Sequence, residues 1–181
     1  CQHKELEDGA NIVIVGGGPA GYFFAIEVLK KAKKLGKKIN VTILEKKVKK
    51  FEHETIAFRD SCNYCAGGIS PKMYDLLKEL RLSLPKQVIQ SQINSITVQS
   101  HWKNIALKSW RVHSQKPRRM LTVYRGARPK GRTDEYFNFD SFLLHEAVKM
   151  GAQVMSTKVE GVSRDTDGLP QVHYGKGSEQ K

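Results

Sequence analysis

The chain has 181 residues, of which 39% are hydrophobic and 8% aromatic. This is enough for one globular core but short for two domains, given about 100–200 residues per domain. No apolar stretch reaches the roughly 18 residues that a membrane span needs, and the N-terminal CQHKELEDGAN has no signal-peptide core. These features predict a soluble globular protein.

Three cysteines without a disulfide-rich pattern favour a cytoplasmic location. The first residue is Cys1 rather than Met, and the sequence stops soon after a strand-like run. We therefore expect both ends to be truncated.

The first predicted element is the apolar run NIVIV, Asn11–Val15, which has the length of a strand. The spacing then becomes helical from about Pro19 to Leu35, and a second β-branched run follows at Ile39–Leu44. Both runs are apolar throughout, as in parallel strands that are covered on both faces. We predict adjacent parallel strands with the helix crossing between them.

The motif Gly16-x-Gly18-x-x-Gly21 lies between this strand and this helix. In a dinucleotide-binding unit the first glycine allows the tight turn, the second lets backbone approach the pyrophosphate, and the third lets helix and strand pack closely. The helix N-terminus directs N–H groups at the phosphates, and a carboxylate after the second strand binds a ribose, the place that Glu45 holds. The cofactor-binding residues predicted here are Gly16, Gly18, Pro19, Ala20, Gly21, Glu45 and Lys46.

Lysine and arginine number 31 against 18 aspartates and glutamates, which gives a net charge of +13. Much of this excess is expected in KKAKKLGKK and KKVKK. Such a charge permits an anionic membrane surface, nucleic acid or an acidic partner, but no known nucleic-acid module accompanies it. A solvated helix face is favoured, because the lysines fall mainly away from a predicted apolar stripe of Phe24, Val28, Ala32 and Leu35.

An irregular stretch, SCNYCAGGISP, precedes a short helix predicted to begin near Pro71. Its Cys62 and Cys65 form a CxxC, which suits a redox dithiol or half of a zinc site. Zinc needs two more ligands, and the other cysteine and the histidines show no paired ligand spacing, so we predict no metal. Because ligands of open α/β sheets gather beyond the strand ends and Gly67-Gly68 permits close approach, we expect a cofactor near this loop. An ordinary glycine turn is the alternative.

The remaining elements are predicted from alternation and end signals. VIQSQINSITVQS, NIALKSWRVHS and MLTVY alternate apolar and polar residues, which predicts an antiparallel insertion at about residues 86–132. A helix that starts at Asn138 or Asp140 stops at Gly151 and leads to another strand. A turn at Asp167-Gly168 precedes the last strand-like run.

The blocks GGGPAG…ILEKK, CAGGISP and FNFDSFLLHEAVKMGAQV are similar to FAD-dependent oxidoreductases of the geranylgeranyl reductase type, relatives of flavin monooxygenases and electron-transfer-flavoprotein dehydrogenases. The similarity spans roughly Asn11 to Val159. It implies an α/β, Rossmann-like FAD/NAD(P)-binding fold with a parallel sheet and an antiparallel β insertion, incomplete at the C-terminus. Residues 1–181 would be the N-terminal part of an FAD-binding domain, with the substrate domain missing.

The resemblance also implies residue roles. The three motif glycines would hold the FAD pyrophosphate and Glu45 the ribose, while Val159 would lie beside the adenine. The loop containing Gly67 and Gly68 would pass near the flavin, with Cys65 as the candidate catalytic residue and Cys62 peripheral.

Two family features are absent from the sequence. An arginine often stands three residues before the Asp of the FD block, but Phe137 occupies that position and the nearest candidates are Arg128 and Arg132. The chain also has no Gly-Asp dipeptide, with which this fold class closes its FAD site. We therefore expect the chain alone to bind FAD poorly.

The favoured interpretation is an FAD-dependent oxidoreductase that transfers hydride or electrons to or from an organic substrate. A small-molecule or lipid-like substrate, NAD(P)H as electron donor and an electron-transfer partner are the expected reactants. Two alternatives stay open: an NAD(P)-binding dehydrogenase, and a basic interaction module on a Rossmann-like scaffold.

Overall fold

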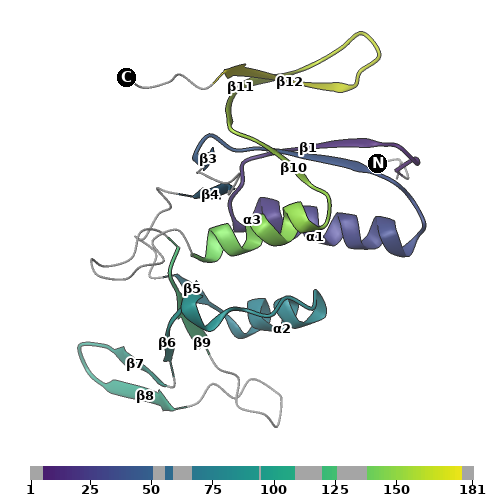
Figure 1. Ribbon diagram of the computed structural model, residues 1–181. Coiled ribbons are helices and arrows are strands. Elements are labelled where there is room, and N and C mark those ends of the chain that lie inside the picture. The colour runs from purple at the N-terminus through teal and green to yellow at the C-terminus, as the bar shows by residue number, and fades with distance from the viewer. Residues whose placement is uncertain are drawn as a thin grey trace. The chain divides into compact units, whose positions relative to one another are not determined.

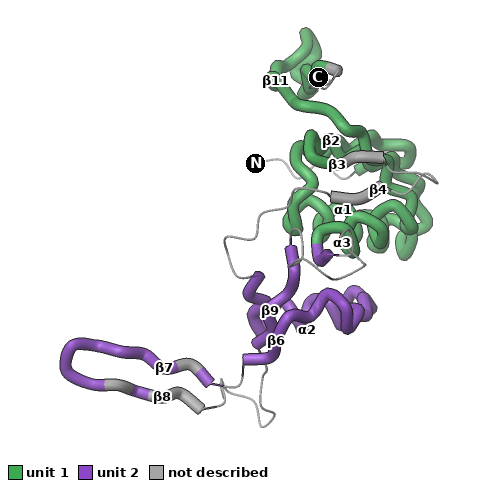
Figure 2. The backbone as a smooth tube through the Cα atoms, turned by 60° about the vertical axis from the view of Figure 1, so that its left-hand side comes forward, with its two compact units in different colours: residues 1–60, 140–181 green, residues 61–139 purple. Residues whose placement is uncertain are grey.

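The computed structural model describes residues 6–50, 56–58, 67–93, 95–108, 120–125 and 138–176. The chain divides into two compact units, shown in different colours in Figure 2. Unit 1 comprises Cys1–Asp60 and Asp140–Lys181, and unit 2 comprises Ser61–Phe139.

Unit 1 is built on a three-stranded parallel sheet in the order β1-β2-β10. Strand β1 (Asn11–Val15) pairs in parallel with β2 (Asn40–Leu44), and helix α1 (Pro19–Lys34) connects them. Strand β10 (Gln153–Met155) pairs with the other edge of β2. The predicted β-α-β unit is thus confirmed, with β2 beginning one residue later than expected.

Helix α1 buries only part of the predicted stripe. Its buried residues are Tyr22, Phe23, Ala25, Ile26 and Ala32, of which Ala32 belongs to that stripe. Val28 is half-buried, whereas Phe24 and Leu35 are 52% and 69% exposed, so the prediction was wrong for these two. Phe24 and Val28 have the same helical spacing as Tyr22 and Ile26, and only packing against the sheet selects between two such rows.

Helix α3 (Phe139–Lys149), a hairpin and two short strands complete unit 1. Helix α3 starts directly after Asn138 and is followed by Gly151 in a left-handed conformation, as predicted. Strands β11 (Thr157–Arg164) and β12 (Pro170–Lys176) form an antiparallel hairpin after the predicted turn. Figure 1 shows α1 and α3 on one side of the parallel sheet and the hairpin on the other. Two short strands, β3 (Val48–Lys50) and β4 (Ile56–Phe58), pair with each other in an antiparallel arrangement.

Unit 2 contains the predicted antiparallel strands and the predicted short helix. Strands β5 (Gly68–Ile69), β9 (Met120–Val123) and β6 (Ile89–Ile93) form one sheet, and β7 (Ser95–Gln99) pairs only with β8 (Asn104–Lys108) among the described strands. Helix α2 (Pro71–Glu79) begins at the predicted proline, and the hydroxyl of Ser70 caps it by accepting the Met73 N–H. A short 3₁₀ helix (Lys86–Val88) leads into β6.

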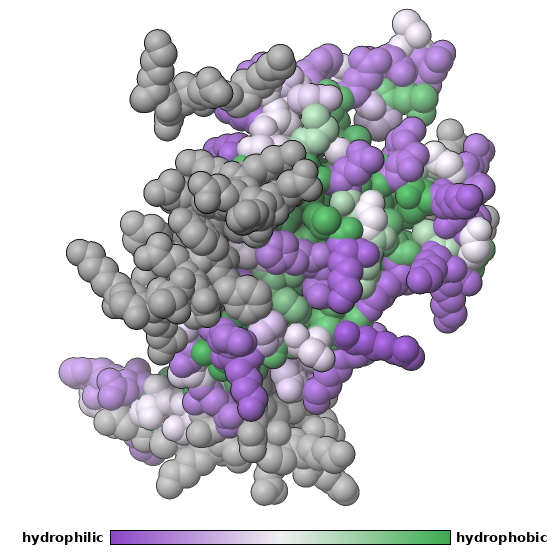
Figure 3. Space-filling model, in the orientation of Figure 1, coloured by the Kyte–Doolittle hydropathy of each residue, from purple (hydrophilic) through white to green (hydrophobic). Residues whose placement is uncertain are grey.

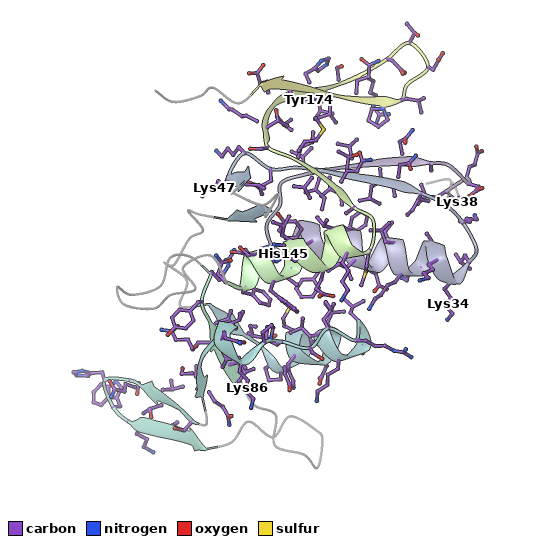
Figure 4. All side chains as sticks on the ribbon, in the orientation of Figure 1. Lys34, Lys38, Lys47, Lys86, His145 and Tyr174 are labelled. Atoms are coloured by element: carbon purple, nitrogen blue, oxygen red, sulfur yellow. The ribbon has the colours of Figure 1, made fainter. Side chains whose placement is uncertain are left out.

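The surface of unit 1 carries the lysine run around the end of α1. Figure 4 shows Lys34 and Lys38 at one end of the unit and Lys47 at the other. On the face drawn in Figure 3, hydrophobic residues are visible among hydrophilic ones over the sheet and its helices. None of the described helices is long and apolar enough to cross a lipid bilayer.

Candidate nucleotide-binding site

The predicted glycine turn joins the carboxyl end of β1 to the N-terminus of α1. Gly16 has a φ of +98°, a conformation that L-residues with side chains rarely adopt. Its N–H donates to the carbonyl of Leu44, the last residue of β2, at 2.9 Å. The turn is therefore fixed to the end of the neighbouring strand.

Glu45 lies against this turn, where the sequence predicts an acidic residue. Its Oε2 accepts the Gly17 N–H at 2.8 Å, and its Oε1 accepts the Lys47 N–H at 2.9 Å. Its own N–H donates to the Met155 carbonyl at 3.0 Å. The carboxylate is thus held by its side chain and backbone at the carboxyl ends of all three parallel strands.

Gly17 lies between the Tyr22 hydroxyl and the Glu45 side chain, and neither Gly17 nor Tyr22 is among the predicted site residues. A Cβ on Gly17 would collide with the Tyr22 hydroxyl oxygen and lie 2.9 Å from the Glu45 Cβ. Tyr22 is fully buried, and burial, followed by the Glu45 and then the Asp140 carboxylates, raises the pKa of its hydroxyl. The middle glycine of GGG and the aromatic residue directly after the motif were the sequence signals that could have predicted this arrangement.

The glycines of the turn differ in why they are needed. A Cβ on Gly21 would strike the carbonyl oxygen of Gly16, so this glycine allows the helix to approach the strand. A Cβ on Gly18 would meet no atom of the described residues within 4 Å, and its φ of −78° suits any residue. The fold itself requires glycine at 16, 17 and 21 but leaves open space beside Gly18.

The N-terminus of α1 suits an anionic group. Gly18 is the N-cap and supplies no side-chain acceptor, Pro19 occupies the first turn, and that turn of the described helix contains no acidic residue. The first-turn N–H groups and the positive end of the helix dipole are therefore not neutralised by an acidic residue of the helix itself, and the nearby Glu45 carboxylate accepts the Gly17 N–H just before the N-cap. Open space lies beside the Gly18 Cα, so the backbone there is accessible to an anionic ligand.

The predicted ribose ligand also fits its role. Each carboxylate oxygen of Glu45 accepts one backbone N–H and has further lone pairs to accept a ribose hydroxyl. The half-buried side chain lies beside the glycine turn. Lys46 is exposed just beyond it, whereas the lysine run that ends at Lys38 precedes the opposite end of β2.

The other predicted site residues lie elsewhere in the fold. Val159 is half-buried on β11, opposite Tyr174 of β12. Gly67 has a φ of +60°, and its carbonyl accepts the Val123 N–H at 3.0 Å. A Cβ there would collide with the Val123 carbonyl oxygen, so glycine is needed for packing against β9. Gly68 is exposed on β5, and the cofactor contacts of this loop and of Val159 stay predictions.

Several predicted residues lie outside the described part of the chain. They are Cys62, Cys65, Arg128, Arg132 and Phe137. His145, by contrast, is an exposed residue on α3 (Figure 4).

Comparison with known proteins gives matches only among solved structures. No protein-family model and no curated protein sequence matches the chain. A geranylgeranyl bacteriochlorophyll reductase-like protein from Thermoplasma acidophilum superposes with a TM-score of 0.56 and 20% identity over 87% of this chain and 33% of its own. A flavin-dependent brominase gives 0.56 and 19%, over 92% of this chain and 34% of its own. A flavin-dependent halogenase from Brevundimonas gives 0.56 and 12%, over 92% and 39%.

These similarities establish the fold. The chain has the mixed α/β, Rossmann-like fold of FAD-binding proteins, with a parallel sheet and antiparallel additions, as predicted. It spans about a third of the length of the proteins that it resembles.

Proposed function

We propose that this chain binds the ADP portion of FAD and belongs to an FAD-dependent oxidoreductase. The observation that carries the proposal is the open space beside Gly18 at the N-terminus of α1, next to the fixed carboxylate of Glu45. The fold itself does not need a glycine at position 18. A bound pyrophosphate would need one, because only a residue without a side chain lets the phosphates approach the backbone closely. The flavin-dependent proteins of similar fold favour FAD over NAD(P) alone.

The bound flavin would supply hydride or electron transfer, and this chain would bind and orient the nucleotide. The substrate proposed is a small organic or lipid-like molecule, with NAD(P)H as electron donor or a protein as electron-transfer partner. A cytoplasmic location is part of the same proposal. Both reductases and halogenases share the fold, so the reaction itself rests on chemistry outside the described site.

The test is calorimetric titration of the chain with ADP, FAD and NAD, comparing Gly18→Ala with the natural sequence. The substitution fits the protein without strain, so folding should be unchanged while ADP affinity falls by about tenfold or more, because the methyl group occupies the phosphate position. Gly161→Ala is the matched control, since a Cβ there also meets no described atom within 4 Å and lies on β11, away from the turn.

Equal ADP affinity for Gly18→Ala and the natural chain would contradict the proposed pyrophosphate position. In the complete protein, binding of NAD with no binding of FAD would favour the dehydrogenase alternative.

A further inference from the structure

The hairpin β7–β8 of unit 2 has an unusual exposed surface. Its two strands pair with each other and with no third strand among the described residues. Its turn is well defined: Ser100 donates its N–H to the Lys103 carbonyl at 3.0 Å and accepts the Lys103 N–H on its hydroxyl at 3.0 Å. Figure 2 shows the hairpin as an arm of unit 2.

One face of this arm is apolar and exposed. Val98 and Ile105 are directly opposite each other in the register and are 52% and 54% exposed. Directly opposed residues share a face of the ladder, so they form one aliphatic surface. Trp102, at the tip, is 87% exposed, with the His101 ring edge-on to it at 5.1 Å between ring centroids. A two-stranded hairpin is marginal in water, so this surface gains stability from being covered.

The sequence around the arm is exclusively basic. Residues 80–133 contain five lysines and seven arginines but no aspartate or glutamate. They therefore supply nearly the whole net charge of +13, and the rest of the chain is close to neutral. The excess charge is concentrated here rather than in the lysine runs near α1, and Lys103 places one exposed cation next to Trp102.

We propose that the β7–β8 arm docks on the surface of an anionic lipid bilayer. Tryptophan favours the boundary between headgroups and acyl chains, aliphatic side chains enter the acyl region, and lysine and arginine attract anionic headgroups. Nucleic acid fits less well: Trp102 offers an aromatic face to a base, but the exposed Val98–Ile105 pair gives aliphatic surface that base stacking does not use. The proposal does not rest on the proposed nucleotide site.

The proposal is tested with the chain carrying Trp110→Phe, which leaves Trp102 as its one tryptophan. Vesicles of phosphatidylcholine with phosphatidylglycerol should sediment the protein and shift Trp102 emission to the blue. Vesicles of phosphatidylcholine alone should bind the protein at least about tenfold more weakly, because the electrostatic attraction is missing. Brominated lipids should quench Trp102 if it enters the bilayer.

Two variants separate the apolar and the charged contributions. Val98→Thr with Ile105→Thr keeps β-branched residues but removes aliphatic surface, and Lys103→Glu reverses one charge. Each should weaken binding to anionic vesicles, whereas the controls Val162→Thr and Lys158→Glu on the β11–β12 hairpin, also at exposed positions, should not. Circular dichroism confirms that each variant is folded.

Equal binding to neutral and anionic vesicles would overturn the proposal, as would equal loss in the β11–β12 controls. A Trp102 response to a single-stranded oligonucleotide but not to vesicles would assign the arm to nucleic acid instead.

Discussion

At the scale of single residues, the site depends on contacts among Gly17, Tyr22 and Glu45. The buried Gly17 leaves room for the tyrosine and donates its N–H to the carboxylate. Glu45 therefore has a structural role in addition to its proposed contact with the ribose. The same side chain should affect stability and nucleotide affinity.

Glu45→Ala should lower the free energy of unfolding by about 1–3 kcal/mol, because the buried Gly17 N–H loses its acceptor. Glu45→Gln, which keeps one carbonyl oxygen, should lose less. Urea denaturation followed by circular dichroism measures both. A Glu45→Ala variant within about 0.5 kcal/mol of the natural chain would contradict the structural role.

In the complete flavoprotein, Glu45→Ala should also weaken FAD binding by about 1–3 kcal/mol, the range for an unpaired hydrogen-bonding group. Flavin titration measures this separately from unfolding. Unchanged dissociation constants would contradict the ribose contact even if stability falls.

Tyr22 predicts a specific alkaline sensitivity. Burial, and then the Glu45 and Asp140 carboxylates, raises its pKa above the ordinary value of 10.0. The unfolded chain loses this proton as the pH rises past about 10 while the folded chain retains it, so stability falls by up to about 1.4 kcal/mol per pH unit above that point. Below that pH the contribution is fully present.

Tyr22→Phe should remove this part of the pH dependence, whereas Tyr174→Phe, at a half-exposed position, should not. Urea denaturation on both sides of pH 10 gives the comparison. Parallel pH profiles for the natural chain and Tyr22→Phe would contradict the assigned burial of the phenol.

At the scale of elements, the three parallel strands are not equivalent. Strand β2 lies in the centre of the sheet, and its Val41 and Ile43 are 1% and 0% exposed. Strand β1 lies at an edge, and its Val13 and Val15 are 46% and 53% exposed. The register pairs Val13 with Thr42, so Val13 and Val15 lie on the opposite face of the sheet from Val41 and Ile43. Both runs are apolar in the sequence, so the face that each valine occupies decides what it contributes.

Val41→Thr should therefore lower the free energy of unfolding by about 1–3 kcal/mol, because the added hydroxyl is buried. Val13→Thr should stay within about 0.5 kcal/mol of the natural chain, since the same hydroxyl reaches solvent. Thermal or urea unfolding compares the two isosteric substitutions directly. Equal losses would show that the exposed face of β1 is covered in solution.

At the scale of the whole molecule, the two units carry different parts of the chemistry. Unit 1 holds the glycine turn and Glu45, while unit 2 holds the β7–β8 arm and the whole basic segment of residues 80–133. This chain covers 33–39% of the length of the solved proteins of similar fold.

The sequence by itself determined the β-α-β unit, the glycine turn, the place of Glu45, the start of α2 and both ends of α3. These features depend on local spacing, on glycine conformations and on proline, so neighbouring residues suffice to predict them. The tertiary structure alone decided which face of α1 is buried and that Gly17 lies between Tyr22 and Glu45. It also decided that Gly67 packs against β9 and that Val98 and Ile105 are exposed together. Each depends on contacts between residues distant in sequence or on exclusion from water, and such contacts exist only after the chain has folded.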